Sequence, residues 1–316
     1  MSFEEIPNTN FGTDLISAMV GVPIPAPLKK GFWAAAARLG SGLIDIPAAK
    51  LESYAEDTRS ATAARKMLME STARSLAADF QSAPDVTRRA QARFASKILR
   101  EQVNIEDILQ IAAGNLSGST VTDEPKIIDD DWFNHFESEA VNKSTAEMKS
   151  VFGRILAGEI RKPGTFSIKS IKLISEIDRT TATNFSRLCS LSFNFMVDAR
   201  VLSLGTNASE NGLQKFGLSF PVLNELQHHG LIISDFNSYL PLGQFARNPF
   251  PVDYAGRAYR LTETPPGCGE FRAHGVSFTK VGRELRQIID MTEDQNYTHE
   301  MTVFLGNHSV SLVPIV

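Results

Sequence analysis

The side chains best placed for chemistry are four cations in the first third of the chain. In the stretch VTRRAQARFASKILREQ they follow one another at spacings of four, four and three: Arg89, Arg93, Lys97 and Arg100. On a helix this spacing brings all four to one side, next to an apolar stripe containing Phe94 and Ile98. Such a side can contact the phosphates of nucleic acid or lipid, or it can be the solvated face of an amphipathic helix.

A second basic group lies in the segment 244–260, where arginines alternate with Phe245, Phe250 and Tyr254. Its cations are Arg247, Arg257 and Arg260. Arginine mixed with aromatic residues is a pattern that a DNA-binding wing can have. We therefore group these three residues with the basic stripe as candidate contacts to nucleic acid or phosphate.

Familiar catalytic patterns are missing from the sequence. There is no Walker A motif, no G-x-S-x-G elbow and no Rossmann glycine motif after a strand. The histidines lack metal-ligand spacing, and Asp129-Asp130-Asp131 suits a helix N-terminus better than a metal cluster. Cys268 is the best nucleophile candidate, but no partner can be assigned to it. We predict no catalytic residue, metal or cofactor, assign no small-molecule substrate, and favour a non-enzymatic protein.

Composition narrows the class of protein. The chain has 316 residues, enough for two or three domains, with 42% hydrophobic and 22% charged residues. The formal net charge of -4 is too weak to attract nucleic acid or anionic lipid by a global field. The two cysteines are far apart in sequence, and the N-terminus does not resemble a signal peptide. We predict a cytoplasmic protein.

The elements that must position these side chains are mainly helical. We predict N-terminal long helices, a central helical bundle and a C-terminal winged-helix-like α/β domain. The expected boundaries are an irregular, amphipathic segment at 1–46, a long-helix region at 47–116, a central helical domain at 129–200 and a winged-helix-like domain with terminal strands at 205–316. Asn104 is expected to cap a separate short helix, and residues 117–128 are expected to be a linker.

The segment 28–46 is short, apolar and weakly basic. Its large apolar side chains suit either an interfacial membrane helix or a buried protein interface, and they are Phe32, Trp33, Leu39 and Leu43. The sequence does not decide between these two environments.

The central module has the most definite helix boundaries in the chain. Ser144 or Thr145 is expected to begin a helix with a buried stripe, Pro163-Gly164 ends it, and Ser167 caps the next helix. The run ILAGEI-x-x-PG-T-FS resembles the signature of an uncharacterised bacterial domain-of-unknown-function family, with Phe152 where that family commonly has Trp. More distantly, the layout is similar to abortive-infection alpha-type proteins of phage defence. The resemblance implies no catalytic residues.

The C-terminal third supports the winged-helix prediction. A helix from Phe220 closed by Gly230, strands at 257–262 and 275–279, and a helix at 280–290 follow the order of a winged helix. The helix from Phe220 carries no Arg or Lys, which is poor chemistry for phosphate contact. Further strands are expected within 301–305 and 310–316.

Three functions remain open at this point. The first is a non-enzymatic helical interaction protein, oligomeric, acting as a sensor or effector in bacterial phage defence. Its partner would be a second copy of the chain or another protein. The second is a nucleic-acid-binding regulator that uses the C-terminal winged helix, with DNA as the partner. The third is a peripheral abortive-infection effector that touches a membrane surface through residues 28–46.

Overall fold

The computed structural model divides into two compact units. Unit 1 is Met1–Thr165 and unit 2 is Phe166–Val316, so the division falls inside the central domain predicted at 129–200. The structure describes residues 22–39, 84–119, 127–195, 198–247, 251–264 and 271–315. The predictions for 1–21 and for 40–83, including the first part of the long-helix region, lie outside the described residues.

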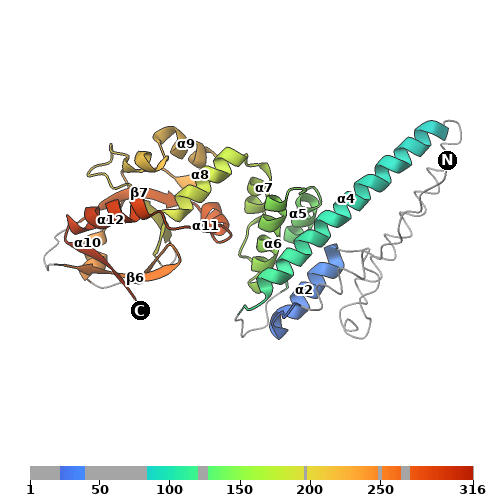
Figure 1. Ribbon diagram of the computed structural model, residues 1–316, viewed down its shortest axis with the longest axis horizontal. Coiled ribbons are helices and arrows are strands. Elements are labelled where there is room, and N and C mark those ends of the chain that lie inside the picture. The colour runs from blue at the N-terminus through green and yellow to red at the C-terminus, as the bar shows by residue number, and fades with distance from the viewer. Residues whose placement is uncertain are drawn as a thin grey trace. The chain divides into compact units, whose positions relative to one another are not determined.

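The described part of unit 1 is helical (Figure 1). Its helices are α2 (Ala26–Leu39), α4 (Pro84–Leu116), α5 (Asp130–Ala140) and α6 (Ala146–Arg161). Asp129 caps α5 by accepting a hydrogen bond from the Trp132 N–H at 3.0 Å, and Thr145 caps α6 in the same way from the Met148 N–H at 3.3 Å. These contacts confirm the prediction that the acidic run begins a helix, and they select Thr145 over Ser144.

The core of unit 1 is the crossing of α4 and α6. At Gly153 of α6 a Cβ atom would lie 2.5 Å from Cγ2 of Ile111 on α4, so the two helices meet where α6 has no side chain. On α6 the predicted stripe is confirmed at Phe152, Ile155 and Leu156, all 0% exposed. Close contact of this kind is what a small residue on a packed helix face permits.

The predicted helix break at Asn104 is wrong, because α4 runs without interruption from Pro84 to Leu116. Asn104 is only 3% exposed, and its amide donates to the carbonyl oxygen of Val141 at 2.8 Å. Its side chain is therefore used in tertiary structure rather than in capping. A local sequence pattern cannot distinguish these two uses of asparagine.

Unit 2 contains an antiparallel sheet of eight strands. The strand order is β3-β7-β2-β1-β5-β6-β8, with β4 paired to β7. The strands are β1 (Phe193–Phe195), β2 (Asp198–Leu202), β3 (Ile232–Ile233), β4 (Tyr239–Leu240), β5 (Pro251–Tyr254), β6 (Arg257–Glu263), β7 (Ala273–Phe278) and β8 (Val310–Pro314). Strands β5 and β6 form a hairpin whose two turn residues, Ala255 and Gly256, both have positive φ, as a tight hairpin turn requires.

Unit 2 also contains helices, which precede these strands or lie between them in the sequence. They are α7 (Ile168–Glu176), α8 (Arg179–Ser190), the 3-10 helix η2 (Gly212–Phe216), α9 (Phe220–His228), α10 (Leu242–Arg247), α11 (Lys280–Arg286) and α12 (Gln295–Gly306). Helix α10 contacts β6, α12 contacts β8, and α11 contacts both α7 and β7. Ser167 caps α7 by accepting from the Ser170 N–H at 3.3 Å, which confirms the predicted cap.

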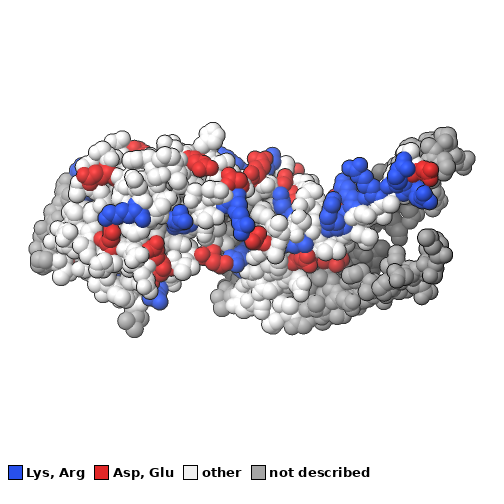
Figure 2. All heavy atoms as spheres, turned by 45° about the horizontal axis from the view of Figure 1, so that its top comes forward, with Lys and Arg blue, Asp and Glu red and all other residues white. Residues whose placement is uncertain are grey.

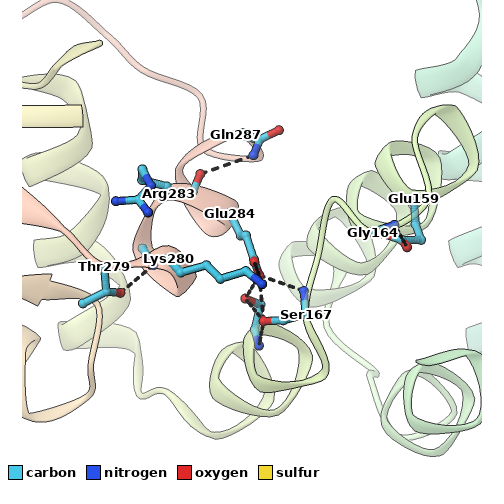
Figure 3. A network of polar contacts seen from close by, with 10 residues as sticks. Glu159, Gly164, Ser167, Thr279, Lys280, Arg283, Glu284 and Gln287 are labelled. Carbon is cyan, nitrogen blue, oxygen red and sulfur yellow. Dashed lines mark hydrogen bonds and ion pairs between the residues drawn. The ribbon is translucent and has the colours of Figure 1, made fainter. Parts of the chain in front are cut away.

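Two buried, charged side chains of α11 form hydrogen bonds to residues at the ends of α7 and α8. Glu284 is 5% exposed, and its Oε2 accepts hydrogen bonds from the N–H and hydroxyl of Ser167, both at 2.7 Å (Figure 3). This carboxylate therefore lies at the positive end of α7. Arg286 is 7% exposed and donates to the Ser192 hydroxyl, just beyond α8, at 2.7 Å. Burial lowers the pKa of Arg286.

The prediction of a mainly α fold with a winged helix is wrong: the chain combines helices with an eight-stranded sheet. The helices α9 and α11 and the strand β6 exist as expected. However, β7 pairs with β2, which precedes α9 in sequence, with Val201 opposite Val276. The predicted strand at 301–305 is part of α12. Strands of two to seven residues carry too little alternation to be recognised locally, and their partners lie far away in sequence.

Candidate functional site

Helix α4 carries a continuous apolar stripe that other described residues cover only in its C-terminal part. In residues 104–116 the stripe is at most 2% exposed and consists of Ile105, Ile108, Leu109, Ala112 and Leu116. Helix α6 packs against α4 in unit 1. At 3.6 residues per turn, Phe94 and Ile98 fall on the same face as these residues. They lie on that face before Ile105, closer to the N-terminus of α4.

The first half of the helix, residues 84–103, is called the α4 arm below. It extends past α5 and α6 (Figure 1). Phe94 is 63% exposed and Ile98 41%, and a second apolar ridge has Leu99 at 65% and Val103 at 44%. At 100° per residue, Gln91, Ala95 and Gln102 lie between the two ridges. The arm thus presents an apolar surface on a regular helix, a combination that soluble proteins usually bury against a partner.

The predicted basic stripe lies along the same arm, where blue atoms gather in Figure 2. All four of its residues are exposed, and they occupy one sector about 80° wide beside the apolar ridges. Lys97 lies 3.6 Å from Glu101. Within the described part of the chain, Arg89, Arg93 and Arg100 form no ion pair. The arm therefore has one apolar side and one basic side.

The second predicted basic group belongs to unit 2 and does not form a comparable stripe. Arg247 ends α10, and Arg257 and Arg260 lie three positions apart on β6, so the last two leave opposite faces of the strand. All three are exposed, and Arg257 lies 3.8 Å from Glu293. Nearby Tyr254 is 0% exposed, and burial raises its pKa to about 12. This aromatic residue belongs to the core and is not a platform for bases.

Of the apolar residues predicted to meet a membrane or an interface, two lie in the core of unit 1. Phe32 is 0% exposed and Leu39 5%, on a helix that contacts α4 and α6. Trp33 is half-buried, and Leu43 lies outside the described residues. Phe32 and Leu39 would have to leave this core to reach a bilayer. Among the described residues, no helix is both long and apolar enough to cross a membrane.

One set of side chains in unit 2 could hold a metal ion. The ligand atoms of Asp178, Glu225 and His229 all lie within 4.8 Å of one another. Asp178 caps α8, and hydrogen bonds from Thr181 lower the pKa of Asp178. The hydroxyl of Thr181 is 2.7 Å from Asp178 and 2.9 Å from Glu225. The spacing of four between Glu225 and His229 is visible in the sequence, but only the tertiary structure brings Asp178 beside them.

Cys189, the cysteine that the structure describes, does not carry a reactive thiol. Cys189 is fully buried, and burial raises the pKa of its thiol far above the usual range, so the thiol stays protonated. Cys268, the candidate nucleophile, lies outside the described residues. Glu159 of the ILAGEI run is 2% exposed and accepts a hydrogen bond from the Gly164 N–H at 2.5 Å, which closes the turn after α6 (Figure 3).

Comparison with known proteins places this architecture in a family. The model of the family described as "Protein of unknown function (DUF2806)" matches residues 88–302, which is more than half of the chain. The chain belongs to the DUF2806 family. The match begins within the α4 arm and runs through both units to α12. No curated protein and no solved structure matches the chain.

Proposed function

We propose that this DUF2806 protein is a non-enzymatic interaction protein that pairs with a second copy of itself through the α4 arm. The observation that carries the proposal is the stripe on α4. Helix α6 packs on it in residues 104–116, and it continues through Phe94 and Ile98, which are exposed. A helix with an exposed apolar stripe is stabilised by a second helix that supplies the missing contacts.

The pattern of the arm favours self-pairing over other partners. In an antiparallel pair, Phe94 can face the partner's Ile98, and two-fold symmetry then makes the same contact twice. Ala90 lies four residues before Phe94 on the same face, and its small side chain allows close approach of two helices. The basic sector lies to one side of the ridges, so it can remain in solvent. The resemblance to abortive-infection proteins suggests phage defence as the setting of this assembly.

The test is the mass of the full chain in solution, measured by light scattering at micromolar concentration. We expect a dimer for the wild type and a monomer for the double variant Phe94→Lys, Ile98→Lys, because two lysines cannot be buried in the seam. The matched control is Ile127→Lys, which replaces an 80% exposed isoleucine outside the arm and should leave the dimer intact. A monomeric wild type, or a double variant that still dimerises, contradicts the proposal.

A second function is favoured by the arginines of the arm that have no ion pair among the described residues. Arg89, Arg93 and Arg100, together with Lys97, could neutralise about four phosphates of a nucleic acid. Binding to labelled duplex DNA should then fall about 10²-fold between 50 and 200 mM salt. The variant Arg93→Glu, Lys97→Glu should abolish binding, whereas the exposed control Lys172→Glu in α7 should not. Binding that ignores both salt and the double variant contradicts this function.

A further inference from the structure

Unit 2 contains a surface cavity of about 620 Å³ beside the first turns of α12. Its size falls within the range of roughly 300–1,000 Å³ typical of small-molecule sites. Its wall is formed by Arg187 of α8, by the end of η2 and by residues of α12 that include His299. Segments that are distant in sequence therefore meet at this cavity, within one compact unit.

Arg187 is the cation of this cavity that has no carboxylate partner among the described residues. Its one hydrogen bond described by the structure is a long contact of 3.5 Å to Asn184, on its own helix. The guanidinium lies against Gly217, where a Cβ atom would be 2.6 Å from Nη1. Gly217 also has a φ of 77°, which side chains other than glycine rarely adopt. The backbone thus leaves room for the guanidinium at the cavity wall.

Among the described residues, neither acid of the cavity wall forms an ion pair with Arg187. Asp294 caps α12 by accepting a hydrogen bond from the Tyr297 N–H at 3.0 Å. Glu300 pairs with Lys215 at 2.8 Å. Because Asp294 already occupies the N-terminus of α12, the group left for an anion is the guanidinium of Arg187, whose donor groups are open. A guanidinium can bind a carboxylate or a phosphate through two parallel hydrogen bonds.

Phe216 adds an aromatic wall that is held in place. Its ring packs edge-to-face on Tyr297, with 5.1 Å between ring centroids and an interplanar angle of 87°. Tyr297 is 0% exposed, and its hydroxyl donates to the carbonyl oxygen of Leu202 at 2.9 Å. Because its support is buried, the half-buried ring of Phe216 is a firm surface for a planar ligand group.

We propose that this cavity binds a small organic anion with a planar ring, its carboxylate or phosphate on Arg187 and its ring against Phe216. The proposal concerns unit 2 alone and is independent of pairing through the α4 arm. The anionic group and the ring are both required, since the cavity offers one open cation and one aromatic wall.

The experiment is calorimetric titration of the full chain with four probes. AMP and benzoate each carry a ring and an anion, adenosine lacks the anion, and inorganic phosphate lacks the ring. We expect AMP or benzoate to bind with a dissociation constant below about 1 mM, and adenosine and phosphate to bind at least about 10-fold more weakly. Binding of AMP alone identifies a phosphate site, and binding of benzoate alone identifies a carboxylate site.

Substitutions inside and outside the cavity test whether the probe binds at Arg187. Arg187→Gln should weaken the binding of the active probe by about 10-fold or more, because a charged pair of hydrogen bonds is lost. Arg88→Gln on the α4 arm and Lys172→Gln in α7 replace exposed cations outside the cavity, and these control variants should leave the affinity unchanged. The proposal is overturned if neither AMP nor benzoate binds, if adenosine binds as well as AMP, or if Arg187→Gln binds as the wild type does.

Discussion

The two halves of α4 have the same kind of sequence and opposite environments. In residues 104–116 the apolar stripe is packed in unit 1, and Leu109 is 0% exposed. In the arm the same face is open, and Phe94 is 63% exposed. Hydrophobic periodicity therefore shows which face of a helix is able to be buried. Whether that face is buried depends on the elements that the rest of the chain brings to it.

The largest expected difference in the free energy of unfolding is between alanine substitutions of two leucines, one in the buried part of α4 and one in the arm. Leu109→Ala should lower the free energy of unfolding by about 2–5 kcal/mol, because it leaves a cavity in the core. Leu99→Ala, at a side chain that is 65% exposed, should change it by less than about 0.5 kcal/mol. Urea denaturation monitored by circular dichroism measures both. A loss at Leu99 as large as that at Leu109 would mean that the second ridge, and not only the stripe of Phe94 and Ile98, is covered in solution.

Replacing each of two glycines by alanine should change the stability of the protein in opposite directions. Gly153→Ala places a Cβ 2.5 Å from the Ile111 side chain and should destabilise unit 1 by about 1–3 kcal/mol through overpacking. Gly114→Ala meets nothing within 4 Å on the exposed side of α4 and should stabilise the helix by about 0.5–1 kcal/mol. Thermal unfolding of the two variants should shift in opposite directions. Shifts in the same direction would contradict the close crossing of α4 and α6.

Asn104 stands at the junction of the two halves and tests where burial begins. Asn104→Ala removes the donor to the Val141 carbonyl and should cost about 1–2 kcal/mol. The control is Asn115→Ala, which loses a hydrogen bond of the same length, 2.8 Å, to Ile111 at an exposed position and should be nearly neutral. Equal effects in urea denaturation would show that Asn104 acts only within its own helix.

The smallest expected contrast concerns two lysine ion pairs. Lys149 lies 2.6 Å from Asp107, with 13% of the lysine side chain exposed, whereas Lys97 lies 3.6 Å from Glu101 with 61% exposed. Lys149→Gln should cost about 0.5–1 kcal/mol, and Lys97→Gln less than about 0.5 kcal/mol. Repeating the denaturation at 1 M salt should shrink the first effect. An unchanged effect would mean that packing of the lysine stem, rather than charge, is responsible.

Local signals in the sequence predicted the helices of the central module well. Pro163-Gly164 ends α6, Ser167 caps α7, and Phe152 and Leu156 are in the core, all as expected. Proline, glycine and capping side chains act over a few residues, so their effect is readable from the sequence. Asn104 was misread because its hydrogen-bond partner is 37 residues away.

The candidate sites were less predictable. The basic stripe was visible because Arg89, Arg93, Lys97 and Arg100 belong to one helix and follow its period. The cavity was not, because Arg187, Gly217 and His299 meet only after the chain has folded. The same holds for Asp178 beside Glu225 and His229.

By itself, the sequence determined where the helices of the central module begin and end, which of their faces are apolar, and that one helix carries cations beside an apolar stripe. Only the tertiary structure decided that β7 pairs with β2, that eight strands form one sheet, and that the apolar stripe of α4 is buried at Leu109 and exposed at Phe94. The physical reason is the separation in sequence between the residues that interact. Capping and periodicity depend on neighbours within a few residues, whereas strand pairing and burial depend on which distant segments the folded chain places side by side.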